Sequence, residues 1–298
     1  MTHANEFSIS RRSAMAGLAA GALAAPAPTP AEAAPGADAW MSTPKGILDT
    51  YIRVQGDLTG KVCPWRWHGY MVAVTPTENP KVLFACEGVE TKKVFVRETG
   101  FEMWSKVMTI FKDPDSGEVL NGKTWKNPFT GAMNTVKPNI VGSKTLYTVS
   151  DTGTILGAKV GDEPNPFLKD QAGAKPTAPP PPKSAPDEMK LQFIVLGDKV
   201  QIAGQRKYPD KRPIPLAEFG TTTAELADIR DTKKPRVEAV FAAAFLAPWQ
   251  GFLEMPTQPG HAVWHAVGRK MEGFEGLSPE YLAQAKIHIP DVLAWAEM

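Results

Sequence analysis

Short runs of alternating apolar and polar residues, rich in aromatic and β-branched side chains, recur along most of the chain. Such period-two runs predict β-strands that bury one face, and turn residues separate them at close spacing. The predicted strands cover residues 66–74, 82–86, 92–97, 101–111, a short stretch near 135, 146–149, 154–160, 191–196, 199–203, 237–247 and 261–268. Short helices are predicted at 43–54, 222–229 and 279–288.

This succession of elements predicts the fold class. Because no long amphipathic helix comes between the strands, they are expected to pair as an antiparallel meander. Such a meander closes into a barrel or folds into a sandwich. The sequence therefore predicts a mainly β (α+β) protein, an antiparallel β-barrel-like or sandwich domain with a few short peripheral helices.

Turn and loop residues indicate where the strands end and how far the domain extends. The Asp-Pro-Asp-Ser-Gly sequence at 113–117 is typical of a β-turn, and Gly197-Asp198 predicts a hairpin. Residues 164–186 include four consecutive prolines and little that could be buried, so they predict a Pro-rich insertion on the surface. Neither half holds a complete core, and residues 34–298 are predicted to form a single β-rich domain.

The first 33 residues predict a twin-arginine signal peptide. Arg11 and Arg12 precede an Ala- and Gly-rich run that is too short to span a bilayer, and Ala31-Glu32-Ala33 is typical of a cleavage site. These features predict export of the folded protein by the Tat export machinery to the periplasm. A Sec signal with two incidental arginines is the alternative. No later stretch predicts a membrane span.

Composition and motifs narrow the range of partners. The 33 Lys and Arg residues balance 32 Asp and Glu residues, which argues against nucleic-acid binding. No Walker A loop, GxGxxG, GxSxG or CxxCH motif occurs, so no cofactor is predicted. Counting from the predicted hairpin does not place Cys63 opposite Cys86, so a disulfide is not favoured. The sequence leaves open whether the protein forms a homo-oligomer.

Several motifs are shared with a known family. They are Trp67-His68-Gly69-Tyr70, the sequences at 113–120 and 125–131, Pro259-Gly260-His261, and the sequence at 265–270. Together they resemble the DUF1838 proteins, an uncharacterised family found in bacteria and fungi. The chain departs from the family pattern at 105–108, where an Arg-Glu pair is missing. The resemblance implies a common fold and implies no activity.

The histidines are the first candidates for chemistry. His261 and His265 share one face of a predicted strand, and inside a barrel they would act as a general base and its partner. With His68 they would make three ligands of a metal site. Structural histidines held by hydrogen bonds are the alternative.

The strand at 66–74 carries the second candidate set. Arg66, His68 and Tyr70 share one face, and Trp67 belongs to the other. If the polar face lines a cavity, it offers a cation, an imidazole and a phenol to a small ligand. If it faces solvent, these residues are merely exposed. The residues expected to bind substrate are Arg66, Trp67, Trp125, Trp264 and Arg269.

Acid–base groups without a cofactor motif predict a periplasmic, cofactor-independent enzyme. It would act on a small apolar or aromatic molecule by proton transfer, as a lyase or isomerase, with His68, Tyr70, His261 and His265 as acid and base. Two alternatives are kept. One is a non-enzymatic barrel that binds a hydrophobic ligand, and the other is a metal-dependent enzyme with His68, His261 and His265 as ligands.

Overall fold

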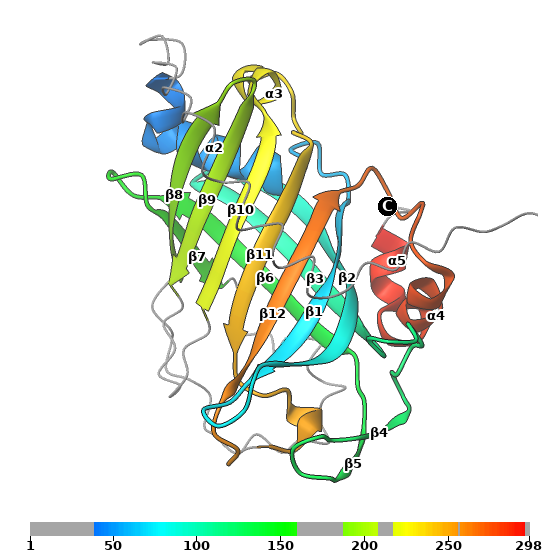
Figure 1. Ribbon diagram of the computed structural model, residues 1–298. Coiled ribbons are helices and arrows are strands. Elements are labelled where there is room, and N and C mark those ends of the chain that lie inside the picture. Colours follow the sequence, from blue (N-terminus) through cyan, green and yellow to red (C-terminus); the bar gives the residue numbers. More distant parts are fainter. Residues whose placement is uncertain (1–38, 160–186, 208–216, 256, 296–298) are drawn as a thin grey trace, which may run out of the picture. The chain divides into compact units, whose positions relative to one another are not determined.

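The computed structural model describes residues 39–159, 187–207, 217–255 and 257–295 (Figure 1). The predicted signal peptide at 1–33 and the Pro-rich insertion at 164–186 lie outside the described residues. Ten antiparallel strands of the described part form a closed barrel in the order β1-β12-β11-β10-β9-β8-β7-β6-β3-β2. This confirms the mainly β prediction and decides between its two forms in favour of a barrel.

Each barrel strand pairs with both of its neighbours. The strands are β1 (Cys63–Val74), β2 (Lys81–Arg97), β3 (Gly100–Lys112), β6 (Asn139–Val149), β7 (Ile155–Lys159), β8 (Asp187–Leu196), β9 (Lys199–Lys207), β10 (Ala217–Glu225), β11 (Ala239–Ala247) and β12 (His261–Lys270). A separate two-stranded sheet consists of β4 (Thr124–Lys126) and β5 (Met133–Thr135). The helices are η1 (Ala39–Ser42), α2 (Pro44–Gln55), α3 (Leu226–Arg230), η3 (Gly251–Leu253), α4 (Pro279–His288) and α5 (Pro290–Trp295).

Three predicted elements are corrected by the structure. The strands predicted at 82–86 and 92–97 are one continuous strand, β2, which runs through Glu87, Glu90 and Lys92 without a turn. The helix predicted at 222–229 is wrong in its first half, because β10 continues to Glu225 and only residues 226–230 are helical. Three consecutive threonines at 221–223 favour the strand, since β-branched side chains fit a pleated sheet better than a helix.

One end of the barrel is covered by α2. Thr43 caps this helix by accepting a hydrogen bond from Gly46 N at 3.1 Å, and Pro44 occupies its first turn. Its apolar residues Leu48 and Ile52 pack against inward-facing residues of β2, β3, β6, β7 and β8. The helix thus buries its apolar face in the barrel end.

The opposite end is covered by the β4–β5 hairpin and η3 (Figure 1). The buried side chain of Asn127 links these two segments, because its Nδ2 donates to Leu253 O at 2.9 Å and its Oδ1 accepts from Phe129 N at 2.9 Å. Trp125 packs on Phe84, with ring centroids 4.8 Å apart. The interior of the barrel lies between the two covers.

On the outside, α4 and α5 pack against β2 and β3, where Val89, Met108 and Ile110 are buried beneath Tyr281 and its neighbours. Among the described residues, no helix combines the length and apolar character that a bilayer crossing needs.

Both cysteines lie in the barrel wall as free, buried thiols in the described structure. The prediction that disfavoured a disulfide is therefore confirmed. Burial raises the pKa of the Cys63 and Cys86 thiols.

A buried lysine fastens α2 to the barrel. Lys270, which is 3% exposed, donates from Nζ to Arg53 O at 2.8 Å, Gly56 O at 2.6 Å and Val237 O at 3.0 Å. Two of these carbonyls end α2, where a positive charge is favourable. One ammonium group thus satisfies three buried acceptors.

We expect Lys270→Met to lower the free energy of unfolding by about 3–5 kcal/mol, because it leaves three buried carbonyls without their donor. Urea unfolding at pH 7 measures the change. Lys199→Met is the control, since it removes an exposed lysine from an ion pair with Glu225, and it should change stability much less because exposed ion pairs contribute little. Equal losses in the two variants would contradict this role of Lys270.

Candidate functional site

The alternation predicted for β1 is present, and it decides which side chains enter the barrel. Trp65, Trp67 and Met71 belong to the inner face and join the core clusters. Arg66, His68 and Tyr70 alternate with them and face outward, with His68 and Tyr70 exposed. The alternative in which the polar face lines a cavity is therefore corrected, because the bulky apolar side chains occupy the inside.

The histidines of β12 follow the same rule. Ala262, Trp264 and Ala266 face inward and are buried, so His261 and His265 lie on the outer face. His265 is opposite Tyr70, whereas His261 is opposite Val74, about 13 Å farther along the strand at 3.3 Å per residue. The four acid–base candidates thus share an outer surface but no enclosed space.

The metal alternative needs at least three ligands that converge. No group of three His, Cys, Asp or Glu residues with that arrangement occurs in the described ranges. His68, His261 and His265 are spread along two outward faces instead. Burial, and then the nearby charge of Arg66, lower the pKa of the His68 imidazole below its usual value.

Arg66 binds a buried carboxylate on this outer face. Glu87, whose side chain is 1% exposed, accepts from Arg66 Nη2 at 3.1 Å, from Lys112 Nζ at 2.8 Å and from Ser278 Oγ at 2.8 Å. Ser278 is also the N-cap of α4. Arg66 and Glu87 therefore hold α4 against the barrel, which is a structural role.

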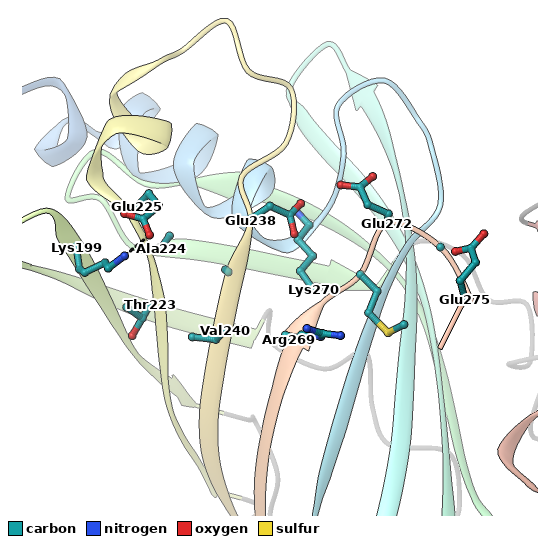
Figure 2. A pocket seen from close by; sticks show the side chains of 13 residues that line it. Lys199, Thr223, Ala224, Glu225, Glu238, Val240, Arg269, Lys270, Glu272 and Glu275 are labelled. Atoms are coloured by element: carbon teal, nitrogen blue, oxygen red, sulfur yellow. Dashed lines mark hydrogen bonds and ion pairs between the residues drawn. The ribbon is translucent and has the colours of Figure 1, made fainter. Parts of the chain in front are cut away.

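Arg269 lines a surface hollow of about 580 Å³ at the ends of β9 to β12. Figure 2 shows charged side chains around it, including the bonded pair Lys199 and Glu225. Lys199, Thr223 and Arg269 belong to outward positions of their strands and Ala224, Ala239 and Lys270 to inward ones, so the hollow lies at the rim of the barrel end. Its rim charges are exposed, and such groups bind weakly in water.

The inner face of the barrel is largely aromatic. Trp67 and Trp264 meet edge to face with centroids 6.5 Å apart, and Phe241 and Phe245 of β11 lie on the same side of the sheet. Of the residues predicted to bind substrate, Trp67 and Trp264 therefore line the lumen. Trp125 belongs to the hairpin that covers the barrel end, where its ring packs on Phe84.

A row of small residues crosses five neighbouring strands on the inner face. Consecutive cross-strand partners in this row are Gly69, Ala266, Ala243, Gly220 and Gly204. An ideal Cβ on Gly220 would come no closer than 3.6 Å to another described atom, and on Gly204 no closer than 3.4 Å. Because eight strands already enclose about as much space as side chains fill, ten strands with small residues leave a hollow.

Exposure inside the closed wall agrees with this inference. Glu90 belongs to the alternate positions of β2 whose side chains face into the barrel, and its cross-strand partners are Trp65 and Val107. Its side chain is nevertheless 31% exposed. Both edges of β2 are hydrogen-bonded to neighbouring strands, so this exposure is towards the lumen. A carboxylate inside a barrel needs a partner, and Lys92 Nζ supplies one at 3.0 Å.

The lysine is itself held firmly. Lys92 Nζ donates to Gln55 Oε1 of α2 at 2.5 Å and lies 5.2 Å from the centre of the Trp65 ring. Its charge is thus shared among a carboxylate, an amide and an aromatic face. Glu90 and Lys92 form the polar wall of the lumen near α2.

Sequence reasoning missed this lumen set. The sequence did not single out Glu90, Lys92, Gly204 and Gly220. Charged residues are common on the outer faces of strands, and glycines are common in bulges. Strand alternation could have identified Glu90 and Lys92. An even number of positions separates them from Phe84 and Cys86, which belong to the core, so all four side chains are on the same face.

Fold and interior together define a closed antiparallel β-barrel with a polar and aromatic lumen. Residues 60–144, which contain β1 to β5 and the start of β6, match the family described as "Protein of unknown function (DUF1838)". Over this stretch the chain is similar to the DUF1838 family. No curated protein matches the chain.

The outer-face cluster predicts a pH dependence. Burial acts to raise the pKa of Glu87, but hydrogen bonds from Lys112 and Ser278 and the charges of Lys112 and Arg66 outweigh it, so the pKa lies below its usual value. We expect Glu87→Gln to lower the free energy of unfolding by about 1–3 kcal/mol at pH 7. The difference should shrink as pH falls from 5 to 3, because the unfolded carboxyl, with a pKa of about 4.3, is protonated first.

Urea unfolding at several pH values measures this effect. Glu78→Gln is the matched control, since Glu78 forms an exposed ion pair with Lys81 and should change stability by at most about 1 kcal/mol. A Glu87→Gln deficit that stayed constant down to pH 3 would show that the carboxylate charge contributes nothing.

Proposed function

We propose that this protein binds a small, largely apolar molecule in the lumen of its barrel. The observation that carries the proposal is Glu90, an inward-facing carboxylate that is one-third exposed inside a closed wall. A lumen open to water beside aromatic side chains has the anatomy of a ligand site, which is concave, mostly apolar and supplied with a few polar groups.

The lining indicates the ligand's size and shape. Phe241, Phe245, Trp67 and Trp264 offer ring faces and edges to an apolar body, and the positions of Gly204 and Gly220 leave room beside them. Barrels that carry hydrophobic ligands use the same arrangement. This favours the binding-protein alternative that the sequence offered.

The acid–base enzyme predicted from the histidines receives less support. His68, Tyr70, His261 and His265 are outside the barrel wall, so they are separated from the lumen by the sheet. Proton transfer needs the acid or base within hydrogen-bond reach of the substrate. A ligand in the lumen would not meet that condition at these four residues.

We propose further that the protein is exported to the periplasm by the Tat pathway. The motif with Arg11 and Arg12 and the small-residue cleavage site support this. A barrel whose two thiols stay reduced and buried can complete folding before export, which is the state in which Tat substrates are carried.

Filling the lumen should abolish binding. We expect Gly220→Phe to weaken binding of the neutral fluorescent probe N-phenyl-1-naphthylamine by at least about tenfold, because the new ring occupies the space that an apolar ligand needs. Thr221→Phe is the matched control. The side chain at this adjacent position faces outward, so the substitution should leave binding unchanged. Fluorescence titration measures the dissociation constants, and circular dichroism checks the fold. A folded Gly220→Phe variant that binds as the wild type does would contradict the proposal.

The export proposal is tested with the full-length chain in a Tat-competent bacterium. Replacing Arg11 and Arg12 together by lysine should keep the precursor in the cytoplasm, because the Tat machinery reads the arginine pair. Cell fractionation and immunoblotting measure the distribution. Export of the double variant at the wild-type level would instead point to the Sec route.

A further inference from the structure

The inner wall formed by β2, β3 and β6 carries polar side chains near α2. Glu90 and Lys92 of β2 face into the barrel, and Ser105 of β3 is the cross-strand partner of Lys92. Ser143 of β6 is the next partner in the same row, and the two serine hydroxyls lie 3.1 Å apart. These four side chains form a polar strip on one side of the lumen.

The strip borders open space inside the barrel. The side chain of Glu90 is 31% exposed, and its row continues through Val107 to Val141, which is 51% exposed. Val141 faces inward, because its neighbour Ile140 packs on the outside with the cluster beneath α4. Both serines of the strip are only half-buried. A molecule in the lumen can therefore touch the Glu90 carboxylate.

One oxygen of the Glu90 carboxylate has no partner in the described part of the chain. Lys92 Nζ lies 3.0 Å from Oε2, which leaves Oε1 as an unused acceptor. An ionised carboxylate accepts several hydrogen bonds and donates none. The lysine is only 8% exposed, and Gln55 and the ring of Trp65 hold it as well. The accessible part of this ion pair is therefore a hydrogen-bond acceptor.

The wall across the lumen from this strip is small and apolar. In a closed ring of ten strands the strand five places away lies opposite, so β9 faces β2, β10 faces β3 and β11 faces β6. Figure 1 shows β9 and β10 in front and β3 and β6 behind them. Gly204 of β9 and Gly220 of β10 leave room on this wall, and Phe241 of β11 adds an aromatic ring. The lumen thus has one polar and one apolar side.

We propose that the lumen ligand carries a hydrogen-bond donor, an O–H or N–H group, that binds Glu90 Oε1, while its apolar body lies against the wall of Gly204, Gly220 and Phe241. This inference rests on the proposed function and names the chemical class of its ligand. A hydrogen bond to a carboxylate is roughly twice as strong as one between neutral groups. Glu90 would thus orient a molecule that is otherwise apolar.

The fixed charges of the interior disfavour an anionic ligand. The Glu90 carboxylate repels an anion, and the nearby cations already have partners. Lys92 is bound to Glu90, and Lys270 is fully occupied by three carbonyls. Arg206, which also faces inward, forms an ion pair with Asp187 at 2.8 Å. Burial of a further negative charge beside Glu90 would therefore be costly.

The test compares probes that differ in the donor. 2-Naphthalenemethanol has the O–H group, and its methyl ether keeps the oxygen but lacks the proton. Each displaces N-phenyl-1-naphthylamine in a fluorescence titration, and the dissociation constant of that fluorescent probe is measured separately for every variant. We expect the wild type to bind the alcohol at least about threefold more tightly than the ether, although the additional methyl group favours the ether in an apolar lumen.

A third probe distinguishes the two kinds of donor. 2-(Aminomethyl)naphthalene is an ammonium at pH 7 and offers charged N–H groups to the same carboxylate. Tighter binding of the amine than of the alcohol would assign a cationic ligand, and the reverse order would assign a neutral one.

Glu90→Gln removes the charge with little change in size. We expect it to reduce the preference for the alcohol over the ether by about three- to tenfold, because a neutral amide accepts a weaker hydrogen bond. Glu90→Asp keeps a negative charge beside Lys92, and it should also reduce the preference because the shorter side chain withdraws the carboxylate from the lumen. Glu87→Gln is the matched control. It makes the same substitution on the outer face of the same strand, so it should leave the preference unchanged even though it lowers stability.

The outcomes separate this inference from the proposed function. If Gly220→Phe prevents binding of the probes but Glu90→Gln and Glu90→Asp leave the alcohol preference unchanged, the Glu90 site is overturned and the lumen site stands. If neither donor probe binds more tightly than the ether, or if 2-naphthoate binds more tightly than the alcohol, the ligand class is overturned. If Gly220→Phe leaves the probes bound, the lumen itself is not the site and both proposals fail.

Discussion

Pairing of β1 with both β2 and β12 is the constraint on which the rest of the structure depends. It closes the sheet, so that backbone hydrogen bonds are satisfied around the ring without an exposed edge. Closure also divides every strand into an inner and an outer face with a period of two. The position of each side chain in the sequence thereby decides whether it meets the lumen or the solvent.

The number of strands determines what the inner face must do. Ten strands enclose more space than ordinary side chains fill, and the small residues Gly220 and Gly204 leave the interior wider still. The protein compensates at the ends, where α2 on one side and the β4–β5 hairpin with η3 on the other pack apolar residues against the strand ends. Packing is thus concentrated at the two covers, and the middle is left for other groups.

Period-two alternation was sufficient to predict the fold class and most strands, because it is a local property of the sequence. It also paired Arg66 with His68 and Tyr70, and His261 with His265, on shared faces. Alternation does not say which face is inside, since that depends on partners far along the chain. Trp67 and Trp264 occupy the inner face here, because burial of their large apolar surfaces stabilises the fold more than burial of the histidines on the outer face would.

The same limit explains why the lumen residues escaped notice. Glu90 and Lys92 look like residues of an exposed strand, and only the register of β2 against β1 and β3 turns them inward. In the predicted helix at 222–229, pairing of β10 with β9 and β11 extended the strand through threonines whose local preference already favoured it. Non-local pairing thus decided the first case, and in the second it agreed with the local preference of the threonines.

Hydrogen-bond satisfaction distinguishes structural from functional polar groups in this interior. Lys270 is deeply buried and finds three acceptors, so its burial costs little and it holds α2 in place. Thr109 is buried as deeply and finds none, although a valine of the same shape would avoid that cost. Glu90 and Lys92 are the intermediate case, because they are held by each other and by Gln55 while Glu90 keeps part of its side chain exposed. These groups, rather than the histidines on the outer wall, are the ones that a ligand in the barrel interior would meet.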